Sequence, residues 1–285
     1  MKGVILAAGY GTRFLPATKT IPKEMFPLID TPAIDLIIRE MIDSGIKDIL
    51  VVTSRRKKPL EDYFDREVEL ETAFENEGAS EKLASIRPVD VNIFFMRQQK
   101  MAGTGNALLL VEPFVGNSPF VVAYPDDVLV DGPPLTGQLM DEHHRTGKTV
   151  LAGQELEEGD VSRYGVMDLA TADGEERVRK MVEKPPPGTE PSRVVAYGRY
   201  LYTPEIFDAL RKSLPESVDG EFTQTEAINF MAGDGRVVNC RFKGRIMDVG
   251  TPSGYLEAFV EAGLSREEFR VDFLAFLKKV VAREG

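Results

Sequence analysis

The stretch KGVILAAGYGTRFLPATKTIPKEMFPLID, from Lys2 to Asp30, is the most informative part of this sequence. Its apolar run at residues 4–8 predicts a buried β-strand, which leads directly into a turn containing Gly9 and Gly11. Three cations follow the turn: Arg13, Lys19 and Lys23. Glycines let backbone N–H groups approach a ligand closely, and cations neutralise phosphate charge. The stretch therefore predicts a strand and a loop that hold a polyphosphate at the edge of a sheet.

Two common phosphate-binding patterns do not match this loop. The dinucleotide fingerprint G-x-G-x-x-G requires a third glycine, and Phe14 occupies that position. The P-loop pattern G-x-x-x-x-G-K-[ST] starts at neither Gly9 nor Gly11. The loop is therefore of another kind, and the alternative interpretation is a plain strand–turn–strand with surface lysines.

The first half of the chain alternates between strand and helix patterns. Strands are predicted at residues 4–8, 48–53, 91–96 and 120–124, and helices at residues 32–44, 60–86 and 106–111. Thr31 and Pro32 are the expected N-cap and first residue of the first helix, and Gly78 is expected to break the second. This alternation is typical of a mostly parallel sheet with helices on both faces, which binds ligands at the carboxyl ends of its strands.

The second half of the chain has a more mixed pattern. Strands are predicted at residues 150–154, 164–168, 178–183 and 194–201, and helices at residues 204–212, 225–232 and 266–283. We therefore expect one α/β domain with a mixed, mostly parallel, Rossmann-like central sheet flanked by helices. An apolar stripe on the last helix predicts core packing or contact between subunits, and it consists of Phe269, Phe273, Phe276, Leu277 and Val280.

The composition excludes several classes of protein. The chain has 285 residues, 42% of them hydrophobic, and no apolar run approaches the ~20 residues of a membrane helix. The net charge of −11 argues against nucleic-acid binding, which needs a basic face. One cysteine, Cys240, allows no internal disulfide and predicts a cytoplasmic protein, as does an N-terminus without a signal-peptide pattern.

Three further sequence features indicate structural rather than catalytic roles. The basic run at residues 55–58 predicts a solvated strand-to-helix loop. His143 and His144 match no zinc or protease spacing, so they predict a solvated helix end. Cys240 follows a strand-like run and predicts a small core residue rather than a nucleophile.

The N-terminal loop resembles the signature of the sugar-nucleotide pyrophosphorylases, G-x-G-T-R followed by P-K. The strings LPATK at residues 15–19, IPKEM at 21–25 and PL at 27–28 are similar to those of one branch, the bacterial UTP–glucose-1-phosphate uridylyltransferases. The resemblance implies a glycosyltransferase-A-like fold in which Arg13 and Lys23 grip a triphosphate. It assigns nucleotide binding to Ala7, Ala8, Gly9, Gly11 and Thr12.

A second landmark comprises residues 97–99 and 103–107, RQQ and GTGNA. The resemblance implies that Gln98 reads the uracil edge and that Gly103 lets the base lie against the backbone. An amide suits this task because it offers both a donor and an acceptor. Thr104 and Asn106 depart from the pattern G-L-G-H-A of the branch, which leaves the choice of base open. The alternative interpretation is a glycine-rich turn between a strand and a helix.

Two acidic landmarks follow predicted strands. Asp126 and Asp248 match the metal-binding aspartates of the family, and carboxylate oxygens together with substrate phosphates suit Mg²⁺. Adjacent side chains leave a strand in different directions, so Asp127 is expected to cap the following loop or to share the metal. Asp248 alternatively belongs to the N-cap region of a helix that begins at Pro252 and is capped by Thr251.

The resemblance places a sugar pocket in the second half. Tyr164, Gly165, Glu183 and Gly198 match residues that line it, and Lys184 matches a lysine that holds the sugar phosphate. The string GEFTQTEAI at residues 220–228 has its family counterpart near the sugar but departs from it at Thr223 and Gln224.

The implied reaction is transfer of a uridylyl group from UTP to glucose 1-phosphate, with Arg13, Lys23 and Lys184 as catalytic residues and Mg²⁺ as cofactor. Residues 1–130 would bind the nucleotide, residues 131–250 the sugar phosphate, and residues 251–285 would form C-terminal helices. A homo-oligomer, a dimer or a tetramer, is expected without nucleic-acid or membrane partners. The alternatives are an enzyme specific for dTTP or another sugar, and a non-catalytic paralogue that binds nucleotide and regulates an active partner.

Overall fold

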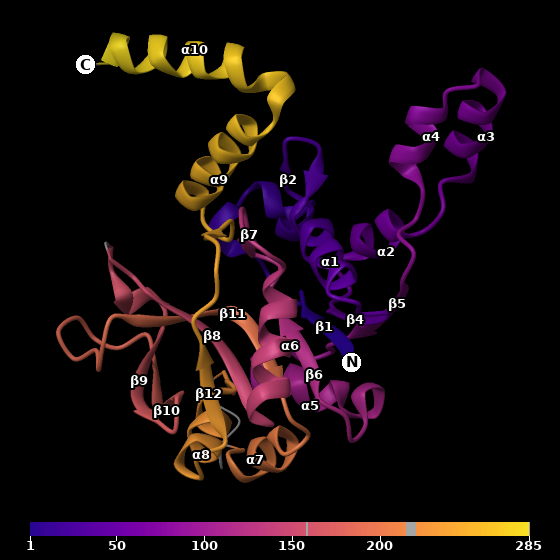
Figure 1. Cartoon of the computed structure of the whole chain (residues 1–285). Coiled ribbons are helices and arrows are strands. Elements are labelled where there is room, and N and C mark those ends of the chain that lie inside the picture. The colour runs from indigo at the N-terminus through magenta and orange to yellow at the C-terminus, as the bar shows by residue number, and fades with distance from the viewer. Residues whose placement is uncertain (158, 215–220, 285) are drawn as a thin grey trace.

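The computed structural model describes residues 1–157, 159–214 and 221–284 (Figure 1). The strands are β1 (Lys2–Leu6), β2 (Pro27–Leu28), β3 (Thr31–Pro32), β4 (Asp48–Thr53), β5 (Asn92–Arg97), β6 (Phe120–Ala123), β7 (Asp127–Leu129), β8 (Thr149–Glu155), β9 (Gly165–Ala172), β10 (Glu175–Glu183), β11 (Val194–Tyr202), β12 (Val237–Cys240) and β13 (Ile246–Asp248). The α-helices are α1 (Ala33–Asp43), α2 (Lys58–Phe64), α3 (Val68–Glu77), α4 (Ser80–Ile86), α5 (Thr104–Val115), α6 (Leu135–Thr146), α7 (Ile206–Lys212), α8 (Thr225–Gly233), α9 (Pro252–Ser265) and α10 (Glu267–Glu284). Short 3-10 turns are η1 (Thr12–Phe14), η2 (Ala17–Lys19), η3 (Lys23–Met25) and η4 (Val161–Arg163).

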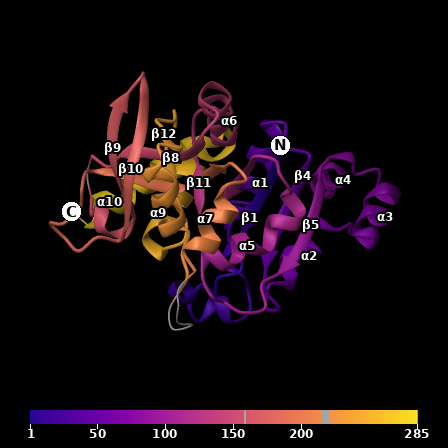
Figure 2. The same ribbon diagram turned by 90° about the horizontal axis from the view of Figure 1, so that it is seen from below.

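One nine-stranded sheet runs through the molecule in the order β5-β4-β1-β6-β11-β8-β12-β10-β9. Seven of these strands run in one direction, and β10 and β11 run in the other. The hairpin β9–β10 lies at one end of the molecule and α3 and α4 lie at the other (Figures 1 and 2). The expected α/β fold with a mixed, mostly parallel sheet is confirmed.

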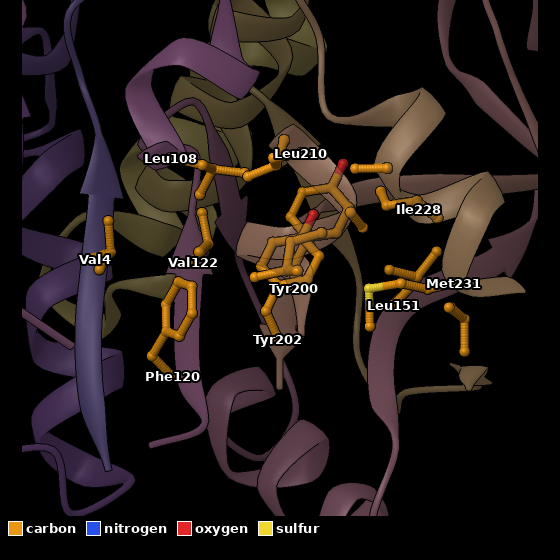
Figure 3. Close-up of a cluster of buried hydrophobic side chains, with 14 of the residues drawn as sticks. Val4, Leu108, Phe120, Val122, Leu151, Tyr200, Tyr202, Leu210, Ile228 and Met231 are labelled. Carbon is orange, nitrogen blue, oxygen red and sulfur yellow. The ribbon is translucent and has the colours of Figure 1, made fainter. Parts of the chain in front are cut away.

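Side chains alternate between the two faces of the sheet, and each face carries its own core. On one face, strand residues such as Val4 and Val122 pack with α5, α7 and α8 (Figure 3). On the other face, Ile5 and Val121 pack with residues of α1 and α6. Successive side chains of a strand point to opposite faces, so neighbouring apolar residues enter different cores. The expected helices on both faces are therefore confirmed.

Several local predictions are wrong. Thr31 does not cap α1 but lies in β3, and its hydroxyl donates to Oδ1 of Asp30 at 2.9 Å. The region 60–86 is broken at Gly78 as expected, with φ +67°, but also between α2 and α3. Lys57 is not solvated but only 4% exposed, because its ammonium binds a buried carboxylate. Strand β7 and most of α6 have no predicted counterpart, since their apolar residues are few.

The C-terminal helix α10 lies apart from the sheet, beyond α9 (Figure 1). Its apolar stripe does not form core: Phe269 is 42% exposed and Phe276 57% exposed. The ring of Phe273 lies against Gly263 of α9. Within the described ranges, no helix is both long and apolar enough to cross a membrane.

A buried ion pair joins helix α1 to strand β11 of the central sheet. Arg199 of β11 is fully buried, and its Nη2 donates to Oε2 of Glu40 at 2.9 Å. Glu40 Oε1 also accepts hydrogen bonds from the backbone N–H and the hydroxyl of Thr136. Burial alone would raise the pKa of Glu40, but the charge of Arg199 and the hydrogen bonds from Arg199 and Thr136 together outweigh it and lower that pKa from its ordinary value of 4.5.

Replacing Glu40 by Gln should lower the free energy of unfolding by about 3–5 kcal/mol at pH 7, because Arg199 would lose its buried counter-ion. The pKa of Glu40 is lower in the folded state, so its stabilisation is present above the unfolded pKa and lost as pH falls through the folded pKa. Urea titrations of both proteins at several pH values measure this. The gap between them should narrow below pH 4.5, and a constant gap would contradict the assignment.

Candidate active site

The glycine loop begins where β1 ends. The Ala7 N–H donates to the Val52 carbonyl at 2.8 Å, which extends the pairing of β1 with β4 by one residue. Gly9 faces open space, and Gly11 has a φ of +67°, a backbone conformation that side chains with a Cβ rarely adopt. The Thr18 hydroxyl closes the loop by donating to the Gly11 carbonyl at 2.8 Å. The chain therefore turns back at the carboxyl end of β1, as the sequence predicts.

Two of the three cations that follow the glycine turn, Lys23 and Arg13, lie close to an acidic cluster. Lys23 of η3 forms a hydrogen-bonded ion pair with Oδ2 of Asp126, which follows β6. Burial lowers the pKa of Lys23, but the charges of Asp126 and Glu24 outweigh it and raise that pKa. Arg13 of η1 lines the same cleft as Asp126 and Asp248, and its charge favours the ionised form of both carboxyls.

Two carboxylates of the cluster converge on Gly250. A Cβ at Gly250 would collide with Oδ2 of Asp126 and would lie 2.9 Å from Oδ1 of Asp248. Asp248 also accepts a hydrogen bond from the Gly250 N–H at 2.8 Å, and Thr251 caps α9 by accepting from Gly254, so the predicted N-cap region of this landmark is confirmed. Burial raises the pKa of Asp248, whereas Lys23 holds the pKa of Asp126 low against the effect of burial.

Asp127 accepts a hydrogen bond from a neighbouring strand and not from the loop that follows it, where it was expected to act as a cap. It begins β7, and its Oδ2 accepts a hydrogen bond from the Gly198 N–H at 2.6 Å, so it does not cap the following loop. A Cβ at Gly198 would lie 2.5 Å from that oxygen, which explains why glycine occupies this position. Burial and the negative charges of Asp126 and Asp248 raise the pKa of Asp127 to about 7.

The second landmark forms a compact turn at the start of α5. Gln98 is only 5% exposed, and its Nε2 donates to the Gly103 carbonyl at 3.2 Å and to Oδ1 of Asn106 at 3.1 Å. Gly103 has a φ of +95°, and a Cβ there would collide with the Phe222 carbonyl. Among the described residues, Gln98 Oε1 accepts no hydrogen bond, so the amide is oriented with its acceptor available.

The predicted sugar residues lie around the same cleft, which has a volume of about 270 Å³. Its lining comprises Arg13, Thr104, Tyr124, Asp126, Asp127, Arg163, Tyr164, Gly165, Met181, Glu183, Lys184, Ala196, Gly198, Tyr200, Glu221, Thr223, Gln224, Thr225 and Asp248. Lys184 has a φ of +45°, an uncommon conformation for a residue with a side chain, and its Nζ lies 3.4 Å from Glu183 Oε1. Cations and acids from both halves of the chain thus share one cleft.

The structure separates the predicted residues into two groups. Eight of them line the cleft: Arg13, Asp126, Tyr164, Gly165, Glu183, Lys184, Gly198 and Asp248. The others lie in three places outside the lining of the cleft. Ala7, Ala8, Gly9, Gly11 and Thr12 belong to the glycine loop, Lys23 lies on η3, and Gln98 and Gly103 belong to the turn before α5. Arg163 was not predicted, although its position directly before Tyr164 was an available signal. Of the string at residues 220–228, Gly220 lies outside the described residues, and four of the residues 221–225 line the cleft.

The acidic cluster fits a hard divalent cation. The carboxylate oxygens of Asp126 and Asp248 share the space beside Gly250, and the Lys23 ammonium already places a positive charge there. The described residues contain no cluster of three or more His, Cys, Asp or Glu that could enclose a metal by themselves. Two carboxylates with substrate phosphates are a usual set of ligands for Mg²⁺.

Comparisons with known proteins agree with this geometry. The family model described as nucleotidyl transferase matches residues 2–263. The chain belongs to the nucleotidyl transferase family. Among its relatives, the UTP–glucose-1-phosphate uridylyltransferase of Staphylococcus epidermidis is 42% identical over 282 residues, which cover 98% of both chains. That of Bacillus subtilis is 38% identical and covers 98% of its own length and 99% of this chain.

Solved structures of nucleotidyl transferases extend the similarity. A UTP-bound UGPase from Acinetobacter baumannii has a TM-score of 0.87 and 33% identity, over 97% of this chain and 98% of that one. A UDP-glucose pyrophosphorylase complexed with UDP-glucose has a TM-score of 0.82 and 35% identity, over 93% and 99%. The resemblance predicted from residues 2–30 is therefore confirmed over nearly the whole chain.

Proposed function

We propose that this nucleotidyl transferase joins UTP and α-D-glucose 1-phosphate to give UDP-glucose and pyrophosphate. The observation that carries the proposal is the single cleft in which Arg13, Asp126, Asp248 and Lys184 meet at the carboxyl edge of the sheet. The relatives named UTP–glucose-1-phosphate uridylyltransferase and the UTP-bound structure support the choice of substrates.

The reaction requires little proton transfer. A phosphate oxygen of glucose 1-phosphate attacks the α-phosphorus of UTP in line, and the bond to pyrophosphate breaks with its electron pair on the leaving oxygen. The attacking oxygen is already an anion at neutral pH, so the site needs no general base. The task of the protein is to bring two polyanions together and to stabilise the charge as it shifts.

The cations of the chain divide this task. Arg13 and Lys23 hold the triphosphate above the glycine loop, where the backbone of Gly9 and Gly11 allows close approach. Lys184 holds the phosphate of the sugar as a mobile point charge at the opposite side of the cleft. Asp126 and Asp248 would hold Mg²⁺, which when bound neutralises charge on the phosphate oxygens.

The two ends of the substrates would lie in different halves of the chain. Gln98 and Gly103 bind the base, together with Ala7, Ala8 and Thr12 of the loop, so residues 1–130 form the nucleotide half. Tyr164, Gly165, Glu183 and Gly198 surround the sugar, and the Glu183 carboxylate accepts hydrogen bonds from its hydroxyls. Residues 131–250 thus form the sugar-phosphate half of the proposed active site, and residues 251–285 add the C-terminal helices.

Pyrophosphate release tests the proposal. The purified protein is incubated with Mg²⁺, glucose 1-phosphate and UTP, dTTP, CTP, ATP or GTP in separate reactions. Release dominated by UTP is expected. Preference for another nucleotide would retain the reaction but change the substrate, whereas no release with any nucleotide would favour another sugar phosphate or the regulatory paralogue.

Asn106 should control the choice of base through Gln98. Replacing Asn106 by Leu removes one of the two acceptors that orient the Gln98 amide, so the amide could present its donor to the base instead. We expect turnover of UTP to fall and the ratio of CTP to UTP turnover to rise by about tenfold, the effect of roughly one hydrogen bond. The control Asn106→Asp keeps an acceptor and should keep the ratio; an unchanged ratio in both variants would contradict this role.

We also propose that α10 contributes to a homo-oligomer, a dimer or a tetramer. Val271 and Val281 of this helix are 77% and 72% exposed, and Phe276 is more than half exposed, which is unusual for large apolar side chains in water. Light scattering of the chain with and without residues 267–285 would test the assembly.

The single buried thiol of Cys240 supports a cytoplasmic location, because it offers no disulfide.

A further inference from the structure

A buried ion pair lies beside the phosphate loop. Glu24 of η3 is 2% exposed and Lys57, which directly precedes α2, is 4% exposed. The Lys57 Nζ donates to Oε1 of Glu24 at 2.5 Å. Both side chains are almost fully buried, so neither is placed to contact substrate in the proposed reaction. Burying two charges costs several kcal/mol per ion, so such a pair is weak evidence for stability and points to a positional role.

The pair is placed to control Lys23. Glu24 follows Lys23 in the same short turn, and the Lys23 ammonium binds Asp126 in the wall of the cleft. The charges are close enough to influence one another: Glu24 raises the pKa of Lys23, and Lys23 lowers the pKa of Lys57. Burial is the largest cause of the lowered pKa of Lys57.

The loop that carries Lys23 is supported from the side at a few points, among them the rings of Phe14 and Phe26, which contact Tyr255 of α9. It consists of η1, η2 and η3, whose backbone bonds are local, such as Met25 N–H to the Pro22 carbonyl at 2.9 Å. From the segment after β4, Arg56 Nη2 reaches the Lys19 carbonyl at 3.4 Å and Lys57 reaches Glu24. Oε2 of Glu24 is buried with no hydrogen-bond partner in the described residues, so the carboxylate depends on Lys57.

We propose that Lys57 is a positioning residue, which acts through Glu24 to hold the Lys23 ammonium at the cleft. The inference rests on the proposed nucleotidyl transfer and adds to it a residue from the run 55–58. A salt bridge across 33 residues thereby couples the end of β4 to the phosphate loop. Without it, the buried Glu24 carboxylate would turn toward the charge of Lys23 and withdraw that ammonium from Asp126 and the triphosphate.

The test is a double-mutant cycle of Lys57→Met and Lys23→Met, read as kcat and KM for UTP and as the Kd of UTP. Lys57→Met alone should lower kcat/KM for UTP by about a hundredfold, the usual cost of a small misplacement of a reacting group. In the Lys23→Met background it should cause no further loss, because a positioning residue has nothing left to position. An equal loss in both backgrounds would overturn the proposal and leave Lys57 a structural role.

A control removes a partly buried ion pair that lies away from the cleft. Lys148 pairs with Glu175 where β8 and β10 begin, with side chains 21% and 13% exposed, and Lys148→Met should keep the wild-type kcat/KM. Crystal structures of the Lys57→Met and wild-type proteins give a readout that does not depend on turnover. Lys23 should no longer contact Asp126 in the variant, and a retained contact would overturn the proposal. This readout holds even if the wild-type protein is inactive with UTP. Inactivity with UTP would by itself refute only the proposed function.

Discussion

Replacing Asp126 by Asn should reduce pyrophosphate release by at least about a hundredfold and should abolish its dependence on Mg²⁺. Asn keeps the shape of the side chain but removes the negative charge that binds Lys23 and faces Asp248 across Gly250. A neutral amide oxygen is a far weaker ligand for a divalent cation than a carboxylate. Turnover of UTP and glucose 1-phosphate over a range of Mg²⁺ concentrations measures the effect.

Asp131 provides the matched control for this experiment. It is an exposed aspartate that pairs with Arg245 at 2.8 Å and does not line the cleft. Asp131→Asn should retain the Mg²⁺ dependence of the wild type. Mn²⁺ binding followed by electron paramagnetic resonance adds a readout without turnover, and Asp126→Asn should bind less Mn²⁺ in the presence of UTP. Full activity of Asp126→Asn with Mg²⁺ would exclude Asp126 as a metal ligand.

Replacing Lys184 by Ala should lower kcat by about a hundredfold while the Kd of UTP stays near that of the wild type. Lys184 directly follows β10, which ends at Glu183, and its side chain lines the cleft and is 60% exposed. Its charge would therefore meet the phosphate of the sugar rather than the triphosphate. Steady-state kinetics together with calorimetric titration of UTP separate the two effects.

Two variants control for charge and for the strand. Lys184→Arg keeps the positive charge and should retain part of the activity, although a guanidinium cannot replace a compact ammonium fully. Lys180→Ala removes an exposed lysine from β10, outside the cleft, and should have no effect. Loss of UTP binding in Lys184→Ala would place this lysine at the nucleotide instead.

Much of the architecture could be predicted because it depends on local patterns. Strand β4 spans Asp48–Thr53 as predicted, since a continuous apolar run between turn signals leaves little choice. Positions of β1, β5 and β6 differ from prediction by one or two residues, which is the usual uncertainty at element ends. By contrast, α6 and β7 were missed, because their few apolar residues acquire a buried face only through packing against β8, β11 and α1.

The candidate site likewise has features that could be predicted from the sequence and features that could not. Its residues could be chosen from short motifs, because the need for a glycine or a cation after a strand is a local matter. The partners of these residues could not be predicted. In the structure, Lys23 binds Asp126, which is 103 residues away in the sequence, and Asp127 accepts a hydrogen bond from Gly198, which is 71 residues away. The role of Lys57 was predicted wrongly for this reason: a run of basic residues is normally solvated unless a distant carboxylate is buried beside it.

From the sequence alone, most of the strands and helices, the glycine loop and the kinds of chemical group at the strand ends could be predicted, whereas β7 and α6 could not. The features that could be predicted follow from side-chain periodicity and backbone freedom, which act over a few residues. Only the tertiary structure decided which charges meet, which of two adjacent aspartates faces Gly250, and which lysine is buried. The energies of buried charges depend on partners that the fold brings together from distant segments, so no local pattern encodes them.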